Sequence, residues 1–417
     1  MSTCLAYRNI RYASADRFSP AQLIPFENVE PDRGPGPTPP QNPSRFDVLL
    51  GPPEPLEQSE DCQVLSVFTP RTSGKRPVMM WFHGGAFITG GGELPWYDGS
   101  RLAEEQDVVV VSVTARLGAL GYLCLGESEE PSPATTDQLT AVEWVHRNIA
   151  QFGGDPENIT LFGQSAGGFA IEVLQRWGLG PHVKGVIYQS SDINLGRLSY
   201  QREDVIRQAK SFTEFIGCDP RSLTTAEILK AQKLYADEAG TIEIWAPVRP
   251  KTEQPILTRV LGGWTRDDTL PFIMIEKGIF EPYPGLFEDF GDAMRTRNAT
   301  EMIQGTQSVA DQASDAGADT WLYEFDWEVP ASGWGSPHCI ELPFLFGGRE
   351  TWQSAPMLKG ADWDLLERRG VWMRSIWGAF AKNGEPGAGW QRYSRSIPVI
   401  NRFVHDPGVL AGPAQKS

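Results

Sequence analysis

The sequence predicts an α/β fold in which helices cover both faces of a mostly parallel β-sheet. Short apolar runs rich in β-branched residues recur along the 417-residue chain, and each has the length of one strand. Amphipathic helical patterns lie between several of these runs, which is typical of the crossover connections in a parallel sheet. The predicted strands are Val64–Phe68, Val78–Phe82, Val108–Val113, Ile159–Phe162, Val186–Tyr188, Ile256–Leu261 and Leu322–Phe325. The predicted helices are Leu139–Phe152, Glu203–Ile216, Thr225–Ala239 and about Trp363–Lys382.

The pattern along the chain favours a single domain. We find no repeat and no linker that would divide residues 1–417, and 40% of the residues are apolar, which is enough for one large core. Residues 1–60 are rich in proline and glycine, so we expect an irregular segment wrapped on the surface, with little regular structure. The helical pattern of residues 195–250 predicts a reduced helical cap over the edge of the sheet.

Composition argues against several kinds of partner. The 37 basic and 53 acidic residues give a net charge of −16, which repels phosphate backbones and makes nucleic acid an unsuitable partner. The first residues lack the apolar run of a signal peptide, and the longest apolar stretch is too short for a membrane span, so we expect a cytoplasmic protein. The five cysteines lack metal-ligand spacing, and no dinucleotide-binding glycine pattern is present, so we expect no metal and no cofactor.

The clearest chemical signal is Gly163-Gln164-Ser165-Ala166-Gly167, which has the pattern Gly-x-Ser-x-Gly. It follows the apolar run Ile159–Phe162 and precedes a helical pattern. A sharp strand-to-helix turn of this kind exposes a serine above the sheet and needs glycine where side chains would clash. Five-residue patterns also arise by chance, but the flanking strand and helix favour a nucleophile elbow with Ser165 as the nucleophile.

A second glycine-rich segment, His83-Gly84-Gly85-Ala86-Phe87, follows the run Val78–Phe82. Such a turn leaves backbone N–H groups unpaired, and acyl transfer needs donors where negative charge develops on the carbonyl oxygen. Taken alone, the segment fits an ordinary tight turn equally well. Together with the elbow, it predicts an oxyanion hole.

The general base follows by elimination among the histidines, which are His83, His146, His182, His338 and His405. Behind an elbow of this type the triad follows the chain order serine, acid, histidine, which leaves His338 and His405. We predict His338, because a lone histidine near the end of the sequence is usually solvated. The acid must lie between the serine and the histidine, and Asp267 and Asp268 both follow the run Ile256–Leu261. From the residues alone, both aspartates stay candidates.

These motifs resemble those of the type B carboxylesterases, a family that includes cholinesterases and bacterial para-nitrobenzyl esterases. The matching segments span most of the chain in the family's order. They are Ser59–Cys62 with Val64–Pro70, His83–Phe87, Asp137–Gln138, Trp144–Ile149, Phe152–Thr160, His338–Gly347 and Phe380–Pro386. The resemblance implies the α/β-hydrolase fold and the hydrolysis of carboxylic esters without a cofactor.

Carried over by position, the resemblance implies a catalytic triad and an oxyanion hole. The triad would be Ser165 as nucleophile, His338 as general base and Asp268 as acid, where most members have glutamate. The oxyanion hole would consist of the backbone N–H groups of Gly85, Ala86 and Ala166.

Five further positions are of interest in this resemblance. Ser190 falls where the family often has a serine that supports the histidine. Trp334 and Phe87 fit a pocket wall and core packing equally well. Gln164 replaces the glutamate that most members have beside the serine, which removes a negative charge that cationic substrates use. Asp267 stays a competitor of Asp268, because a threonine replaces the glycine that usually follows the acid.

We therefore expect a serine hydrolase that cleaves carboxylic esters of small or medium-sized molecules through an acyl-enzyme on Ser165. Acyl transfer to another nucleophile, lactone formation or cleavage of a specialised metabolite would use the same triad. A non-catalytic binding or adhesion relative is the third alternative, and the presence of both Ser165 and His338 argues against it. The sequence leaves the natural substrate and the oligomeric state open.

Overall fold

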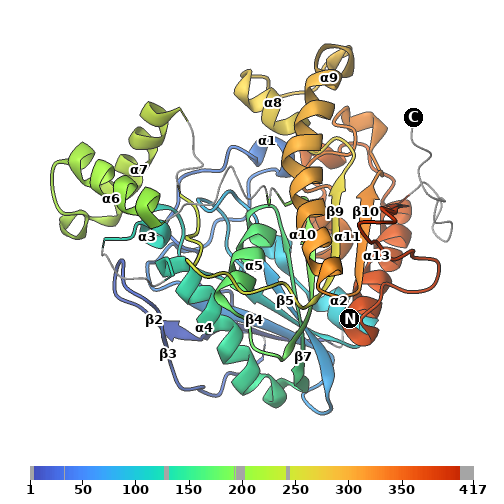
Figure 1. The fold of residues 1–417 in the computed structure, drawn as a ribbon, viewed down its shortest axis with the longest axis horizontal. Coiled ribbons are helices and arrows are strands. Elements are labelled where there is room, and N and C mark those ends of the chain that lie inside the picture. Colours follow the sequence, from blue (N-terminus) through green and yellow to red (C-terminus); the bar gives the residue numbers. More distant parts are fainter. Residues whose placement is uncertain are drawn as a thin grey trace.

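The structure, a computed structural model, describes residues 4–31, 33–125, 131–191, 193, 202–240 and 245–403. At its centre lies a nine-stranded sheet with the order β1-β4-β6-β5-β7-β8-β9-β10-β11 (Figure 1). Strand β4 runs antiparallel to β1 and β6, and every other pair is parallel. The strands are β1 (Leu5–Arg11), β4 (Val64–Thr69), β5 (Arg76–Phe82), β6 (Val109–Val113), β7 (Gly154–Gln164), β8 (Val183–Gln189), β9 (Arg259–Thr265), β10 (Thr320–Phe325) and β11 (Ile400–Phe403). The predicted mostly parallel sheet is confirmed.

The central strands are apolar throughout because both of their faces are buried. Val78 and Met80 of β5 belong to the hydrophobic core on one face, and Met79 and Trp81 belong to the core on the other face. Alternate residues of a strand point to opposite faces, so a strand covered on both sides needs an uninterrupted apolar run. Both cores lie against this one sheet, which supports the proposed organisation as one domain.

Helices cover both faces of the sheet, as predicted. Helices α4 (Pro133–Asn148), α5 (Ala166–Trp177) and α10 (Gln304–Asp315) contribute to one core, and α2 (Ser100–Gln106) and α13 (Trp363–Asn383) contribute to the other. The predicted cap helices are present as α6 (Arg202–Ile216) and α7 (Thr225–Ala239), which extend to the left of the sheet in Figure 1. The remaining α-helices are α1 (Asp47–Leu50), α3 (Gly118–Tyr122), α8 (Leu270–Glu276), α9 (Leu286–Asn298), α11 (Leu342–Leu345) and α12 (Arg349–Trp352).

The structure adds two features to the prediction for residues 1–60. Residues 5–11 form β1, an edge strand that pairs with β4 and buries Tyr7 and Ile10. Two short strands, β2 (Ala13–Ser14) and β3 (Gln22–Leu23), form a separate small sheet. Residues between 38 and 58 line a cavity, described below, where we had expected a surface wrapping. Proline and glycine mark irregular backbone but do not indicate what that backbone packs against.

Strand β9 lies further along the chain than predicted. The apolar run indicated residues 256–261, whereas the strand spans Arg259–Thr265 and includes Gly262 and Gly263. A Cβ atom at Gly263 would lie 2.5 Å from the ring of Tyr323 on β10, so glycine allows the two strands to pair there. As a result, Asp267 and Asp268 lie immediately beyond the end of the strand.

No helix in the described ranges is both long and apolar enough to span a bilayer. The cytoplasmic location inferred from the sequence stays a prediction.

A buried ion-pair network connects α5 to the chain that follows the cap. Glu172 of α5 is fully buried and accepts hydrogen bonds from Arg176, at 2.7 Å, and from Arg249. Both arginines are also buried, and Arg249 donates to Glu253 at 2.9 Å. Because α5 begins directly after Ser165, this network also supports the helix behind the elbow.

We expect Glu172→Gln to lower the free energy of unfolding by about 3 kcal/mol, because it leaves two buried guanidinium groups with too little negative charge. Urea unfolding measured by circular dichroism gives this value. The matched control is Glu143→Gln, which breaks the exposed pair between Glu143 and Arg147. That change is expected to cost less than about 0.5 kcal/mol. Equal losses in both variants would contradict a stabilising role for the buried network.

Candidate active site

Ser165 lies in a strained turn between β7 and α5. Its backbone has φ 55° and ψ −126°, and its N–H group donates to the carbonyl oxygen of Gln189 at 2.8 Å. A Cβ atom at Gly167 would lie 1.9 Å from the carbonyl oxygen of Phe82, so glycine is required for α5 to pack this closely on β5. The side chain of Ser165 lines a cavity at the carboxyl end of the strands. This is the geometry that the Gly-x-Ser-x-Gly pattern predicts.

The glycine-rich turn after β5 lines the same cavity. Gly85, Ala86 and Phe87 all have positive φ, at 113°, 52° and 62°. The first two line the cavity together with Ser165. Ala166 is the first residue of α5, and the N–H groups of a first helical turn have no acceptor within the helix. Gly85 and Ala86 therefore lie in the cavity wall with Ser165, and Ala166 follows Ser165 in the chain. These are the three residues predicted to supply the oxyanion donors.

His338 and Asp268 form a buried hydrogen-bonded pair. Nδ1 of His338 lies 2.5 Å from Oδ1 of Asp268, and the side chains are 2% and 0% exposed. The other carboxylate oxygen of Asp268 accepts the N–H group of Thr265 at 2.9 Å, which fixes the carboxylate at the end of β9. Of the two predicted acids, Asp268 is the one in contact with His338. His405, the other histidine considered as the general base, lies outside the described residues.

Asp267 points elsewhere and holds the loop that carries His338. Its Oδ2 accepts hydrogen bonds from Arg266, at 2.7 and 2.9 Å, and from the N–H group of Ser336 at 2.8 Å. Its own N–H group donates to the carbonyl oxygen of Ser336 at 2.9 Å. Ser336, two residues before His338, is therefore hydrogen-bonded both to the side chain and to the backbone of Asp267.

A second buried carboxyl group, Glu341, lies near Asp268. Burial, together with the negative charge of Asp268, raises the pKa of Glu341 to about 8. A neutral Glu341 at pH 7 avoids a second buried negative charge beside the His338–Asp268 pair. Burial also lowers the pKa of His83, whose Nδ1 lies 2.7 Å from the carbonyl oxygen of Gly84.

Gln164 contacts the Nε2 atom of His338, on the ring edge opposite the Nδ1 atom that Asp268 contacts. The sequence did not predict this contact. The side-chain Nε2 of Gln164 lies 2.9 Å from Nε2 of His338, and Gln164 is 1% exposed. Because Gln164 directly precedes Ser165, the sequence placed it near the site. No pattern in the sequence indicated that its side-chain amide would contact His338.

Ser190, Trp334 and Phe87 do not line the cavity that contains Ser165. Ser190 is buried at the end of β8 with φ 47°, and its hydroxyl has no hydrogen-bond partner within the described ranges. Trp334 is 1% exposed and belongs to a hydrophobic core. Phe87 packs against Tyr122, with ring centroids 5.2 Å apart, and against Phe169. For Trp334 and Phe87, the structure favours the core-packing alternative.

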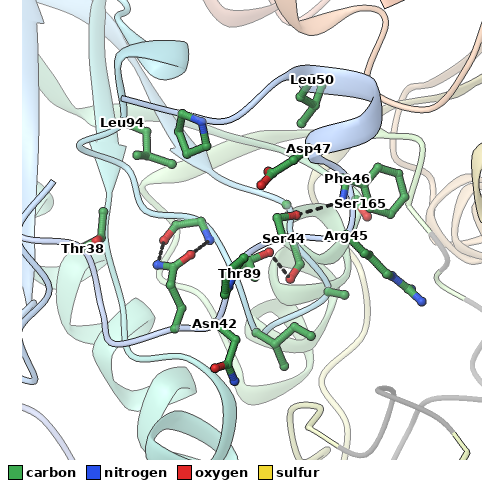
Figure 2. A pocket seen from close by; sticks show the side chains of 18 of the residues that line it. Thr38, Asn42, Ser44, Arg45, Phe46, Asp47, Leu50, Thr89, Leu94 and Ser165 are labelled. Atoms are coloured by element: carbon green, nitrogen blue, oxygen red, sulfur yellow. Dashed lines mark hydrogen bonds between the residues drawn. The ribbon is translucent and has the colours of Figure 1, made fainter. Parts of the chain in front are cut away.

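The cavity beside Ser165 and His338 has a volume of about 530 Å³. Its walls come from residues 38–58, the glycine-rich turn, α7 and the loop of His338. Figure 2 shows part of this wall, with Ser44, Phe46 and Asp47 close to Ser165. Its apolar lining residues include Leu50, Leu94, Trp96, Trp245, Phe272 and Leu342. Its charged lining residues are Arg45, Asp47, Glu54, Lys233 and Asp237. A cavity that combines apolar walls with polar groups is typical of a small-molecule site.

We find no group of three or more His, Cys, Asp or Glu side chains arranged to hold a metal ion in the part of the chain that the structure describes.

Comparison with solved structures supports the fold assignment. A thermophilic para-nitrobenzyl esterase superimposes with a TM-score of 0.81 and 26% identity over 96% of this chain and 92% of that chain. The Geobacillus stearothermophilus carboxylesterase EST55 superimposes with a TM-score of 0.75 and 25% identity over 97% and 93% of the two chains. The fold is therefore the α/β-hydrolase fold.

Sequence comparison gives the family. The model of the "Carboxylesterase family" matches residues 2–258. The Rhodococcus erythropolis protein named "Probable N-octanoylanthranilate hydrolase AqdA2" is 34% identical, over 91% of this chain and 89% of its own. The para-nitrobenzyl esterase of Bacillus subtilis is 30% identical, over 81% of this chain and 77% of its own. On the combined evidence of the elbow, the His338–Asp268 pair and these matches, the chain belongs to the carboxylesterase family.

Proposed function

We propose that this carboxylic ester hydrolase acts through an acyl-enzyme on Ser165, with His338 as general base and Asp268 as the acid that orients it. The observation that carries the proposal is the contact of 2.5 Å between His338 Nδ1 and Asp268 Oδ1, in a wall of the cavity that contains Ser165. A buried carboxylate at Nδ1 fixes the proton on that nitrogen, and so leaves Nε2 unprotonated, as a base requires.

In the acylation step, Nε2 of His338 takes the proton of the Ser165 hydroxyl while Oγ attacks the ester carbonyl carbon. The negative charge that forms on the carbonyl oxygen is stabilised by the N–H groups of Gly85, Ala86 and Ala166. The C–O bond to the alcohol breaks, and the alcohol leaves with the proton from His338. Asp268 stabilises the imidazolium that exists between these two proton transfers.

In the deacylation step, water takes the place of the alcohol. His338 removes a proton from water, the resulting oxygen attacks the acyl carbonyl, and Ser165 leaves with the proton. The sequence of bonds made and broken needs no redox reagent and no metal. Transfer of the acyl group to an added alcohol or amine would compete at this step, and product analysis in their presence separates transfer from hydrolysis.

The cavity favours esters of small or medium-sized apolar molecules. Its volume of about 530 Å³ is in the range of drug-sized ligands, and aromatic and aliphatic side chains form much of its wall. We propose a small-molecule ester as the substrate and leave the identity of the acyl and alcohol groups to the assay.

The proposal is tested by labelling with a fluorophosphonate, which reacts with an activated serine. We expect the protein to hydrolyse para-nitrophenyl butyrate, to lose that activity on labelling, and to carry the label on Ser165 in peptide mass spectrometry. A label on another residue with the same loss of activity would show that the nucleophile is misassigned.

A second candidate reaction is cleavage of an N-acyl anthranilate, an amide. The observation in its favour is the 34% identity to the Rhodococcus protein, which extends over 91% of this chain. The same triad and oxyanion donors would act on an amide carbonyl. Release of anthranilate from N-octanoylanthranilate, measured beside hydrolysis of para-nitrophenyl octanoate, compares the amide with an ester of the same acyl group.

A further inference from the structure

The side chain of Gln164 is within hydrogen-bond distance of Nε2 of His338, the nitrogen that acts as the base in the proposed reaction. Gln164 is the last residue of β7, directly before Ser165, and its buried side chain belongs to the wall of the cavity. Its Nε2 lies 2.9 Å from Nε2 of His338, which is within hydrogen-bond distance. In the described structure, the hydrogen-bonded side chain at this nitrogen is therefore Gln164, and not Ser165.

The direction of this hydrogen bond follows from the other side of the imidazole. The carboxylate of Asp268 at 2.5 Å holds the proton on Nδ1, so the neutral ring has a lone pair on Nε2. A lone pair accepts, so the NH₂ group of Gln164 must be the donor.

The other end of the Gln164 amide, its carbonyl oxygen, packs against Gly84. A Cβ atom at Gly84 would lie 2.5 Å from Oε1 of Gln164, so the carbonyl end of the amide packs closely on this glycine.

The bond to Gln164 and the bond to Ser165 exclude each other. Nε2 of a neutral imidazole has one lone pair in the ring plane, and it can accept one strong hydrogen bond. While the amide donates to that lone pair, the hydroxyl of Ser165 cannot pass its proton to it. The imidazole is then held as a base whose acceptor site is already filled.

We propose that Gln164 holds His338 in a resting state, and that acylation begins when the amide releases Nε2 to Ser165. This inference rests on the proposed function, because it takes Nε2 of His338 as the base. After proton transfer Nε2 carries a hydrogen, so the NH₂ group no longer fits there, whereas a rotated amide can accept through Oε1. Gln164 is thus a positioning residue whose two ends suit the two protonation states of His338.

The first test is Gln164→Met, which keeps the length of the side chain and removes the donor. One hydrogen bond of ordinary net strength competes with the productive state, so its loss is expected to raise kcat/KM for para-nitrophenyl butyrate about two- to tenfold. The rate of fluorophosphonate labelling of Ser165 should rise by the same factor, because labelling uses the same base. A merely structural glutamine predicts a decrease in both.

The second test is the pH profile of Gln164→Glu. A carboxylate cannot donate to the neutral imidazole and accepts from the protonated one, so the acid limb of kcat/KM should move to higher pH by about one unit. Above that limb, the variant should be at least as fast as the wild type. The other charged or titratable groups around the imidazole are the same in both proteins. They are Asp268, Glu341, Cys339, the cavity residue Asp47, and Arg45, which stands over the Phe46 and Phe272 rings that contact His338.

The outcomes separate this inference from the proposed function. If labelling does not map to Ser165, the proposed function itself fails. If it does, and Gln164→Met loses tenfold or more in kcat/KM at an unchanged melting temperature, the glutamine is needed in the productive state and the resting-state inference is overturned. If Gln164→Met is unstable, the pH profile of Gln164→Glu decides, and an acid limb that coincides with the wild type overturns the inference.

Discussion

Replacing Ser165 by alanine is expected to lower kcat for para-nitrophenyl butyrate by at least about 10⁴-fold, because members of a nucleophile–base pair act as a unit. The remaining rate would come from the oxyanion donors and from binding, which the variant keeps. Since the hydroxyl contributes little to binding, KM should change far less than kcat. Steady-state kinetics with stopped-flow or plate-reader detection of para-nitrophenolate measures both constants.

The control for this variant is Ser308→Ala, on α10 and outside the lining of the cavity. We expect it to keep wild-type kinetics. The melting temperature of Ser165→Ala should stay close to that of the wild type, since alanine fills nearly the same space. An alanine variant as active as an active wild type would mean that another group attacks the ester.

The second large effect is expected for Asp268→Asn, compared with Asp267→Asn. The amide in place of the Asp268 carboxylate removes the charge that holds the proton on Nδ1 of His338. The imidazole then favours the tautomer that cannot act as a base at Nε2. By analogy with the equivalent change in serine proteases, kcat is expected to fall about 10³- to 10⁴-fold.

Asp267→Asn is the matched control because the two aspartates are adjacent and both are buried. It weakens the ion pair with Arg266 and the hydrogen bond to the Ser336 N–H group, but leaves the contact of Asp268 with His338 intact. We expect a loss of stability of about 1 kcal/mol and a change in kcat of less than about tenfold. If Asp267→Asn were the more damaging change for kcat, the assignment of the acid would be reversed.

The elements that the sequence predicted best are those with strong local patterns. The strands of the sheet centre, the helices α7 and α13, and the turn at Ser165 are all determined by residues close together in the chain. Three helices between β9 and β10, namely α8, α9 and α10, were not predicted. In α9 the acidic residues Glu288 and Asp289 stand in the first turn and the basic Arg295 and Arg297 in the last. That arrangement suits the helix dipole and was available as a signal.

The parts that could not be predicted depend on contacts between distant segments. The choice between Asp267 and Asp268 depends on where β9 ends, and β9 extends to Thr265 through a pairing that needs glycine at position 263, beside Tyr323. The contact between Gln164 and His338 joins the end of β7 to a distant loop, and no sequence pattern relates the two. The cavity wall made by residues 38–58 lacks periodicity, so its position was visible only in the folded chain.

The make-up of the cavity also bears on how the chain acquires activity. Residues 38–58, the elbow and the loop of His338 are far apart in the sequence, and all contribute to one wall. Long-range contacts of this kind require loop closure before they contribute any stabilisation, so they form late and slow the overall folding rate. In a refolding experiment the helical signal should therefore return before esterase activity does. The recovery of esterase activity would then show that the long-range contacts of the cavity have formed. A measurement of secondary structure alone would not show this.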